Sequence, residues 1–260
     1  MLGQVIATEF LKLRRAKITW LTALGIAIGP LLGGLFMWIL QEPGRAERLG
    51  LLGQKAQFLG QTADWPTYFA LLAQMTGIVS VVLFSLVTAY VFGREYSDGT
   101  AKNMLVLPVT RAWFPVAKFL VVLVWCGLLT VVIITVGFLV GLALKLPGFS
   151  ATLAAASVGE ILLVAFLGYL LMPVVAWIAA LGKGYLAPLG FALLTLLLGM
   201  GLGATGWGKW FPWSIVPLFA GIAGPRTETL AAGSLVVIAL TCAAGVAATI
   251  WQFTYADNHQ

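Results

Sequence analysis

Long apolar stretches without charge constrain this chain more than any other feature of its sequence. The first, Ile18 to Leu40, holds 23 uncharged residues, which form about 34 Å of α-helix at about 1.5 Å per residue. This length matches the hydrocarbon core of a bilayer, which is about 30 Å thick. The stretch is also longer than the apolar core of a signal peptide, so we interpret it as a retained membrane span.

Composition extends this interpretation to the whole chain. Hydrophobic residues make up 61% and charged residues 9%, whereas soluble domains are roughly 45–50% apolar. The net charge of +6 comes from basic residues beside apolar stretches, which favours anionic lipid head groups over nucleic acid. Cys126 and Cys242 lie inside apolar stretches, so we expect neither a disulfide nor a metal site. We therefore predict an all-α, polytopic membrane protein with six spans.

The predicted organisation is a single transmembrane domain over residues 1–260. In chain order we expect an N-terminal interfacial helix at 1–17, spans at 18–40 and 67–92, a cytoplasmic coupling segment at 93–118, spans at 119–144, 151–181 and 185–203, an external re-entrant segment with aromatic residues at 205–228, and a last span at 229–256.

The distribution of charge predicts the orientation. Residues 1–17 carry four basic residues and one acid, whereas the polar segment 41–66 carries three of each sign. The positive-inside rule therefore places the N-terminus in the cytoplasm, and six spans return the C-terminus to the same side. Val5, Ile6, Phe10 and Leu13 share one helical face, which is typical of an amphipathic helix lying on a membrane surface. The alternative interpretation is that residues 1–17 only hold the N-terminus in the cytoplasm through their positive charge. The charged residues of this helix are Glu9, Lys12, Arg14, Arg15 and Lys17.

The polar segment between the second and third spans reads FGREYSDGTAKNMLVLPVTRAWFPVAK, from Phe92 to Lys118. Ser97 or Asp98 can cap the start of a helix, and Pro108 disfavours helical geometry at the residue before it. We therefore predict a short amphipathic helix from Gly99 to Val106. Two interpretations remain open for this segment: a solvated loop that obeys the positive-inside rule, and a docking element for a partner.

The order of residues in this segment resembles the cytoplasmic coupling segment of ABC-2 type transporter permeases. A glutamate at the end of a span is followed by Gly-Thr, a short apolar run, proline and arginine. The matching positions are Glu95, Gly99, Thr100, Leu105, Leu107, Pro108 and Arg111, with Arg94 and Asp98 beside them. The resemblance implies that these residues couple the chain to a separate ATPase, with Arg94, Glu95 and Arg111 as pairing or capping groups at that interface.

The same resemblance implies a bacterial ATP-driven exporter in the cytoplasmic membrane, with both termini in the cytoplasm. The expected partners are a cytoplasmic ABC ATPase, a second permease copy in a homo- or heterodimer, and membrane lipids. ATP and magnesium would bind in the ATPase, so this chain would hold no cofactor and catalyse no reaction itself. The substrate class would be hydrophobic or amphipathic, such as a peptide antibiotic, a drug or a lipid.

Three further features lie within the apolar stretches. Glu160 is the only acid there, and a carboxylate inside a membrane is a candidate for a substrate or gating role. If that span begins at residue 161, Glu160 lies at the outer interface instead. Pro173 is expected to kink the same span and to form a possible hinge. Gly137 and Gly141 form a GxxxG pair, which predicts close approach of another helix.

Other classes of function have weaker support. Residues 203–209, GATGWGK, match the first seven positions of a Walker A loop, but Trp210 replaces the hydroxyl residue that binds magnesium, and no strand is predicted before them. An intramembrane enzyme needs a constellation such as paired aspartates or a Ser-His pair. The only histidine, His259, is near the C-terminus. A self-sufficient secondary transporter or channel centred on Glu160 is the main alternative, and a structural membrane protein is another.

Overall fold

The computed structural model describes residues 2–42, 62–99, 111–222 and 231–255. Every regular element in these ranges is a helix. Six of the helical segments are long and apolar enough to cross a membrane. These findings confirm the predicted all-α, polytopic membrane fold. The predicted helix from Gly99 to Val106 lies outside the described residues except for Gly99, and so do Thr100, Leu105 and Pro108.

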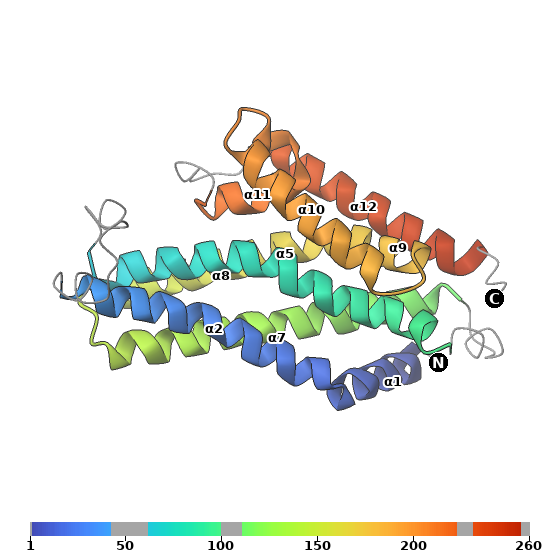
Figure 1. The fold of residues 1–260 in the computed structure, drawn as a ribbon, viewed down its shortest axis with the longest axis horizontal. Helices are drawn as coiled ribbons and strands as arrows, with labels where there is room; N and C mark the ends of the chain where they lie inside the picture. The colour runs from blue at the N-terminus through green and yellow to red at the C-terminus, as the bar shows by residue number, and fades with distance from the viewer. Residues whose placement is uncertain (1, 43–61, 100–110, 223–230, 256–260) are drawn as a thin grey trace.

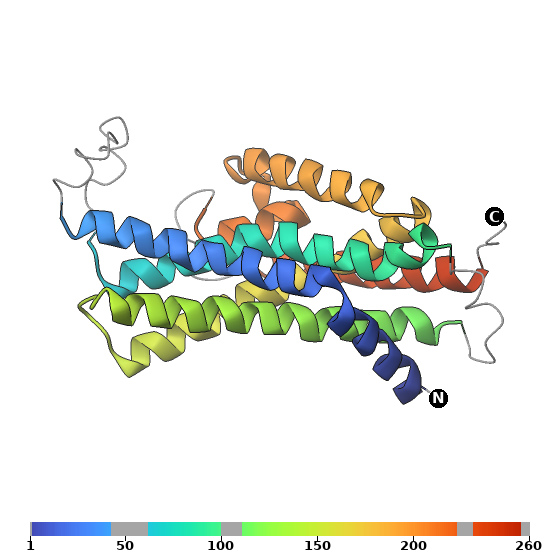
Figure 2. The same cartoon turned by 60° about the horizontal axis from the view of Figure 1, so that its bottom comes forward.

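The helices form one elongated bundle (Figures 1 and 2). They are α1 (Leu2–Arg15), α2 (Lys17–Leu40), α5 (Trp65–Ser97), α7 (Trp113–Ala143), α8 (Ala151–Leu170), α9 (Met172–Leu181), α10 (Leu186–Gly203), the 3-10 helix η2 (Gly208–Trp210), α11 (Pro212–Phe219) and α12 (Ala232–Tyr255). The start of α1 and the end of α12 lie at the same end of the bundle, together with the end of α5 and the start of α7. We call this the terminal end, and the opposite one the far end.

Helix α5 extends further than the expected span 67–92. Asp64 caps its start by accepting a hydrogen bond from the backbone N–H of Thr67 at 2.9 Å. At the other end, Asp98 is the C-cap residue and Gly99 has a φ of +66°, the left-handed conformation in which glycine ends many helices. Asp98 and Gly99 therefore terminate α5. As a result, Arg94 and Glu95 belong to α5 itself. The capping of a following helix by Ser97 or Asp98 stays a prediction, because residues 100–110 lie outside the described chain.

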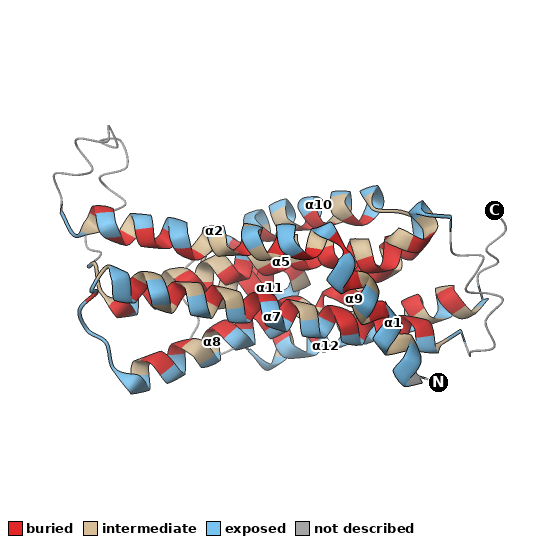
Figure 3. Cartoon of the chain, turned by 90° about the horizontal axis from the view of Figure 1, so that it is seen from below, coloured by how far each residue is buried: buried red, intermediate tan, exposed pale blue. Residues whose placement is uncertain are grey.

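Helix α7 packs closely on α5 through the predicted glycine pair. A Cβ atom at position 137 would lie 2.6 Å from Cδ1 of Leu72, and one at position 141 would overlap the ring of Trp65. The absence of side chains at Gly137 and Gly141 lets α5 and α7 approach, as the GxxxG pattern predicted. Figure 3 shows exposed positions along the outer faces of α2 and α10. Large apolar side chains such as Leu24 and Leu197 are exposed there, as expected for surfaces that face lipid.

The fourth span is interrupted where a kink was predicted. Helix α8 ends at Leu170 and α9 begins at Met172, one residue before Pro173. Helix α12 packs against the break, because a Cβ atom at Gly245 would lie 2.6 Å from the backbone nitrogen of Val174, and the hydroxyl of Thr249 donates to the carbonyl of Pro173 at 3.2 Å. Glu160 lies nine residues, about 14 Å, along α8 from Ala151. It is therefore inside the helix and not at its start.

The segment after α10 turns back into the bundle. A Cβ atom at Gly199 would lie 2.7 Å from the carbonyl oxygen of Trp213. The backbone of α10 therefore lies close against the backbone at the start of α11. Just beyond the end of α11, Ala220 lies against Gly77 in α5. Helices η2 and α11 occupy the described part of the segment where re-entrant helices were expected, and the position of these helices on the external side stays a prediction. Residues 203–209 form the end of α10, a turn and part of η2, so the Walker-like sequence has no strand before it within the described chain.

Candidate functional site

Helix α1 presents its apolar face to the bundle. Leu13 is buried, and Val5, Ile6 and Phe10 are half-buried. Arg14 and Arg15 are exposed on the other side of the helix. Leu13 and Phe10 join the apolar core, so this face packs on protein, whereas the sequence alone had suggested contact with the membrane surface. The same face carries Glu9, which directs a carboxylate into the protein.

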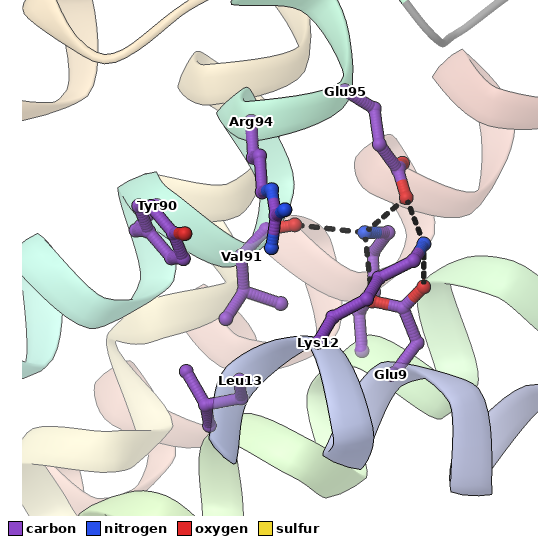
Figure 4. Close-up of a pocket in the computed structure, with 8 residues that line it drawn as sticks. Glu9, Lys12, Leu13, Tyr90, Val91, Arg94 and Glu95 are labelled. Carbon is purple, nitrogen blue, oxygen red and sulfur yellow. Dashed lines mark hydrogen bonds and ion pairs between the residues drawn. The ribbon is translucent and has the colours of Figure 1, made fainter. Parts of the chain in front are cut away.

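Four charged side chains from three helices meet beside this face (Figure 4). They are Glu9 and Lys12 of α1, Glu95 of α5 and Lys118 of α7, and we call them the ionic cluster. The ammonium group of Lys12 lies 2.6 Å from Glu9 Oε1 and 3.0 Å from Glu95 Oε1. The ammonium group of Lys118 lies 3.2 Å from Glu9 Oε2 and 3.1 Å from Glu95 Oε1. Each acid therefore contacts both lysines.

Three members of the cluster are buried, the Lys12 side chain is partly exposed, and the four charges balance. Lys118 is only 1% exposed, Glu95 5% and Glu9 6%. An ammonium group has three donors, and Lys118 uses them on the two carboxylates and on the carbonyl oxygen of Val91 at 2.7 Å. Removing one partner from a buried ion pair leaves an uncompensated charge, which is strongly destabilising. The four charges sum to zero and hold α1, α5 and α7 together.

The pKa shifts of the two cluster residues in α1 favour their charged forms. Burial raises the pKa of Glu9, but the charge of Lys118 and the hydrogen bond from Lys12 lower it by more, so this pKa lies below its ordinary value. Burial lowers the pKa of Lys12, but its hydrogen bond to Glu9 and the charge of Glu95 raise it by more, so this pKa lies above its ordinary value. Both shifts favour the charged forms.

The end of α5 is also held on its other sides. The rings of Tyr90 and Tyr185 stack, with centroids 6.1 Å apart and planes 11° apart. The guanidinium of Arg94 lies 5.6 Å from the Tyr90 ring centroid and pairs with Asp98 at 3.1 Å. Phe253 of α12 contacts the ring of Phe92, with centroids 6.1 Å apart. The last two turns of α5 are thus a junction for several helices.

Comparison with known proteins identifies the family to which this chain belongs. The model of the ABC-2 family transporter proteins matches residues 5–199, about three quarters of the chain. The chain belongs to the ABC-2 transporter family. It is also 29% identical over 183 residues to the bacitracin transport permease protein BCRB of Bacillus licheniformis, an alignment that covers 70% of this chain and 87% of that protein. The match begins in α1 and includes all four residues of the ionic cluster.

Membership of this family settles the general class of the protein. It is the membrane subunit of an ABC transporter, not itself a catalytic chain, and the family implies an ABC ATPase as its partner. The six apolar helices found in the described part of the chain make it a multi-pass membrane protein. The similarity predicted from the coupling segment is therefore confirmed at the level of the family.

The structure places the predicted coupling residues of the permease in different environments. Glu95 points into the protein toward α1 and α7 instead of outward, because α5 stays helical through Ser97 and so keeps Glu95 one turn after the inward-facing Val91. Arg94 is half-buried, and Asp98 and Arg111 are exposed. The exposed basic residues of α1 and its junction with α2 are Arg14, Arg15 and Lys17. Glu160 and Pro173 belong to α8 and α9 and take no part in the ionic cluster.

Sequence reasoning placed Lys118 at the start of a span but assigned it no role. The available signal was a single lysine between apolar residues in FPVAKFLVV, because a cation in such a position needs a buried acid. The pairing itself could not be read from spacing, since Lys118 and Glu9 are 109 residues apart. The stacking of Tyr90 on Tyr185 was likewise not anticipated.

Proposed function

We propose that this chain is the membrane-spanning subunit of an ATP-driven exporter whose terminal end faces the cytoplasm. Charge supports this orientation through the positive-inside rule. The described basic residues at the terminal end are Lys12, Arg14, Arg15, Lys17, Arg94, Arg111, Lys118 and Lys183, against the acids Glu9, Glu95 and Asp98. The described charges in the far-end turns are Glu42, Asp64 and Lys145, two acids and one base.

The observation that carries the proposal is the position of the ionic cluster. Glu95 lies near the end of α5 and Lys118 near the start of α7, so the cluster bridges the two helices that enter and leave the segment 98–112. It also fixes α1 to both of them. Because separating buried ion partners is costly, a push on this segment moves α1, α5 and α7 together. Such a joint suits the transfer of ATPase motion into membrane spans.

The mechanism follows from this joint. Two ATPase subunits bind ATP and magnesium and close, and the segment 98–112 moves with the ATPase surface on which it docks. The ionic cluster spreads that displacement over three helices, which changes the side of the membrane to which the pathway opens. All nucleotide chemistry occurs in the ATPase. This chain supplies docking, rigidity and the pathway.

The pathway and its substrate follow from the apolar interior. Among the described residues, a cavity of about 280 Å³ lies between α5, α7 and α8, and its lining is almost wholly apolar. One permease copy offers little room for a polar substrate there. We therefore propose that two copies, identical or different, enclose the pathway between them and that the substrate is hydrophobic or amphipathic. Similarity to a bacitracin permease favours export of a peptide antibiotic of that class.

The test uses the permease co-purified with its ATPase and reconstituted in liposomes. Glu95→Gln removes one charge from the cluster, and Arg14→Gln is the matched control because it removes an exposed charge from α1. We expect ATP hydrolysis and ATP-driven uptake of labelled bacitracin into inside-out vesicles for the wild type and for Arg14→Gln. Glu95→Gln should lower the bacitracin moved per ATP hydrolysed. If the ATPase fails to co-purify, the proposal is wrong; hydrolysis without bacitracin uptake would reject only the substrate.

A secondary transporter is favoured by one observation, the partly buried carboxylate of Glu160 inside α8. A carboxylate in that position can carry a proton or bind a cation. Transport by the permease alone, driven by an imposed proton or sodium gradient and abolished by Glu160→Gln, would support this alternative. Transport that requires ATP and the ATPase would reject it.

A further inference from the structure

The end of α5 contacts its neighbours on three separate faces. With 3.6 residues per turn, successive residues are rotated by about 100°, so Val91 and Glu95 share one face, Phe92 and Tyr96 a second, and Tyr90, Gly93, Arg94 and Ser97 a third. The first face meets α1 and α7 through the ionic cluster. The second meets Phe253 of α12. The third meets the turn between α9 and α10, residues 182–185, which we call the α9–α10 turn.

This third contact joins backbone to backbone. A Cβ atom at Gly93 would lie 2.8 Å from the carbonyl oxygen of Gly184 and 3.2 Å from Cδ1 of Tyr185. Close-packed contacts of this kind transmit displacement, because no flexible side chain lies between the two surfaces to absorb it. The stack of Tyr185 on Tyr90 adds a second point of attachment. Movement of the end of α5 toward the turn therefore has to move the turn.

The α9–α10 turn is also short and conformationally restricted. Only four residues separate α9 from α10, and Lys183 has a φ of +47°, a left-handed conformation that non-glycine residues keep only where the surroundings enforce it. Beyond the turn, α10 runs to Gly199, which contacts the backbone of Trp213 at the start of α11. A displacement that enters at the turn thus has a packed route along α10 to the start of α11.

We propose that the α9–α10 turn is a second output of the segment 98–112. The turn delivers the movement of α5 to α10, while the ionic cluster delivers it to α1 and α7. Gly93 and Tyr185 are the positioning residues of this output. The inference rests on the proposed function, in which the segment 98–112 receives motion from the ATPase. It adds that α10 moves during the cycle and that it does so through this contact.

Pulsed spin-label distance measurements on the permease–ATPase complex in nanodiscs test the inference. In a background with Cys126→Ser and Cys242→Ser, labels on Leu128→Cys in α7 and Leu197→Cys in α10 report on the second output. A separate pair, Leu11→Cys in α1 with Leu128→Cys, is the control, because the ionic cluster moves α1 and α7 together and their distance should stay constant. We expect ATP, magnesium and vanadate to shift the distance in the α7–α10 pair. Tyr185→Ala and Gly93→Ala should remove that shift, whereas the conservative Tyr185→Phe, which keeps the ring, should retain it.

The outcomes separate this inference from the proposed function. The α1–α7 distance should stay constant in the wild type and in Tyr185→Ala, which shows that the variant is folded. ATP hydrolysis by the ATPase that co-purifies with Tyr185→Ala shows that the variant still binds its partner. An α7–α10 distance that does not change in the wild type, or that changes equally in Tyr185→Ala and Gly93→Ala, overturns the inference and leaves the proposed function standing. If the ATPase does not co-purify with the wild type, the proposed function fails and this inference fails with it.

An engineered disulfide gives a second test through rescue. A Cβ atom at position 184 would lie 3.6 Å from the hydroxyl oxygen of Ser97, a separation compatible with a bridge between Ser97→Cys and Gly184→Cys. Added to Tyr185→Ala, the oxidised bridge should restore the bacitracin moved per ATP by about fivefold, the scale on which single coupling residues act. Reduction should remove the gain. If the bridge instead arrests transport in a chain that keeps Tyr185, the turn must separate from α5 during the cycle, and the inference is wrong.

Discussion

Lys118→Met tests the energetic role of the ionic cluster most directly. Methionine is unbranched and apolar like the lysine stem, so the change removes the charge and its donors with little change in volume. The position is 1% exposed, and Glu9, Glu95 and the carbonyl of Val91 lose a partner together. Breaking a buried ion pair in this way typically costs about 3–5 kcal/mol. Lys12 still contacts both carboxylates, which places the expected loss near the lower end, about 3 kcal/mol.

A charge-balanced double variant separates this cost from simple loss of packing. Lys118→Met combined with Glu95→Gln leaves one acid and one base, so the buried excess of negative charge disappears. We expect thermal unfolding in detergent to show a fall in Tm of about 6–12 °C for Lys118→Met, taking about 2–4 °C per kcal/mol for a chain of this size. The double variant should recover part of that fall. Lys183→Met, which removes an exposed charge from the same end, is the control. A double variant less stable than Lys118→Met would refute the electrostatic reasoning.

Three further changes have outcomes that the structure fixes. Glu9 has a lowered pKa, so its contribution to stability is present above the unfolded pKa and is lost as the pH falls through the folded pKa. The raised pKa of Lys12 keeps its contribution present until the pH rises through its folded pKa. The thermal unfolding temperature of the complex should therefore fall as the pH is lowered from neutral to below 4.5, the ordinary pKa of a glutamate. Gly141→Ala should destabilise the protein by about 1–3 kcal/mol, because its methyl group would overlap the indole ring of Trp65 in α5. Gly127→Ala is the control, since no atom lies within 4 Å of a Cβ there. It should be neutral or stabilising in the same unfolding assay. Lys183→Gly should raise stability by about 1 kcal/mol by removing left-handed strain, and a destabilised variant would contradict that assignment.

The spans could be predicted from the sequence because their signal is local. A stretch such as Ile18 to Leu40 has only one low-energy solution in lipid, a helix that satisfies its own backbone groups. The glycine pair in α7 and the break near Pro173 were accessible for the same reason, since each follows from the shape of one or two residues. The end of α5 was harder to place. Its last residues are polar, so the span was ended at Phe92, whereas the helix continues to Ser97, where Asp98 and Gly99 close it.

The candidate site could be predicted only in part because its contacts join distant parts of the chain. Glu95 was singled out by its place in a family-like motif, but its partner Lys12 is 83 residues away, and no local pattern gives that pairing. Lys118 carried a detectable signal, a lone cation in an apolar stretch, without an indication of which acid it needed. The contact of Gly93 with Gly184 left no signal at all, since glycine is frequent throughout this chain.

The composition of the ionic cluster explains how helices can be joined firmly without relying on apolar packing alone. Apolar surfaces are non-directional, so an apolar contact between α1 and its neighbours would tolerate small rotations and shifts of register. Lys118 has three donors and three acceptors in the observed register. A shift of α1 by one residue would rotate Glu9 by about 100° and leave a fully buried ammonium group short of a partner. The cluster therefore fixes one register of α1 against α5 and α7. Because the register is fixed, a movement of one of these helices is transmitted in full to the other two.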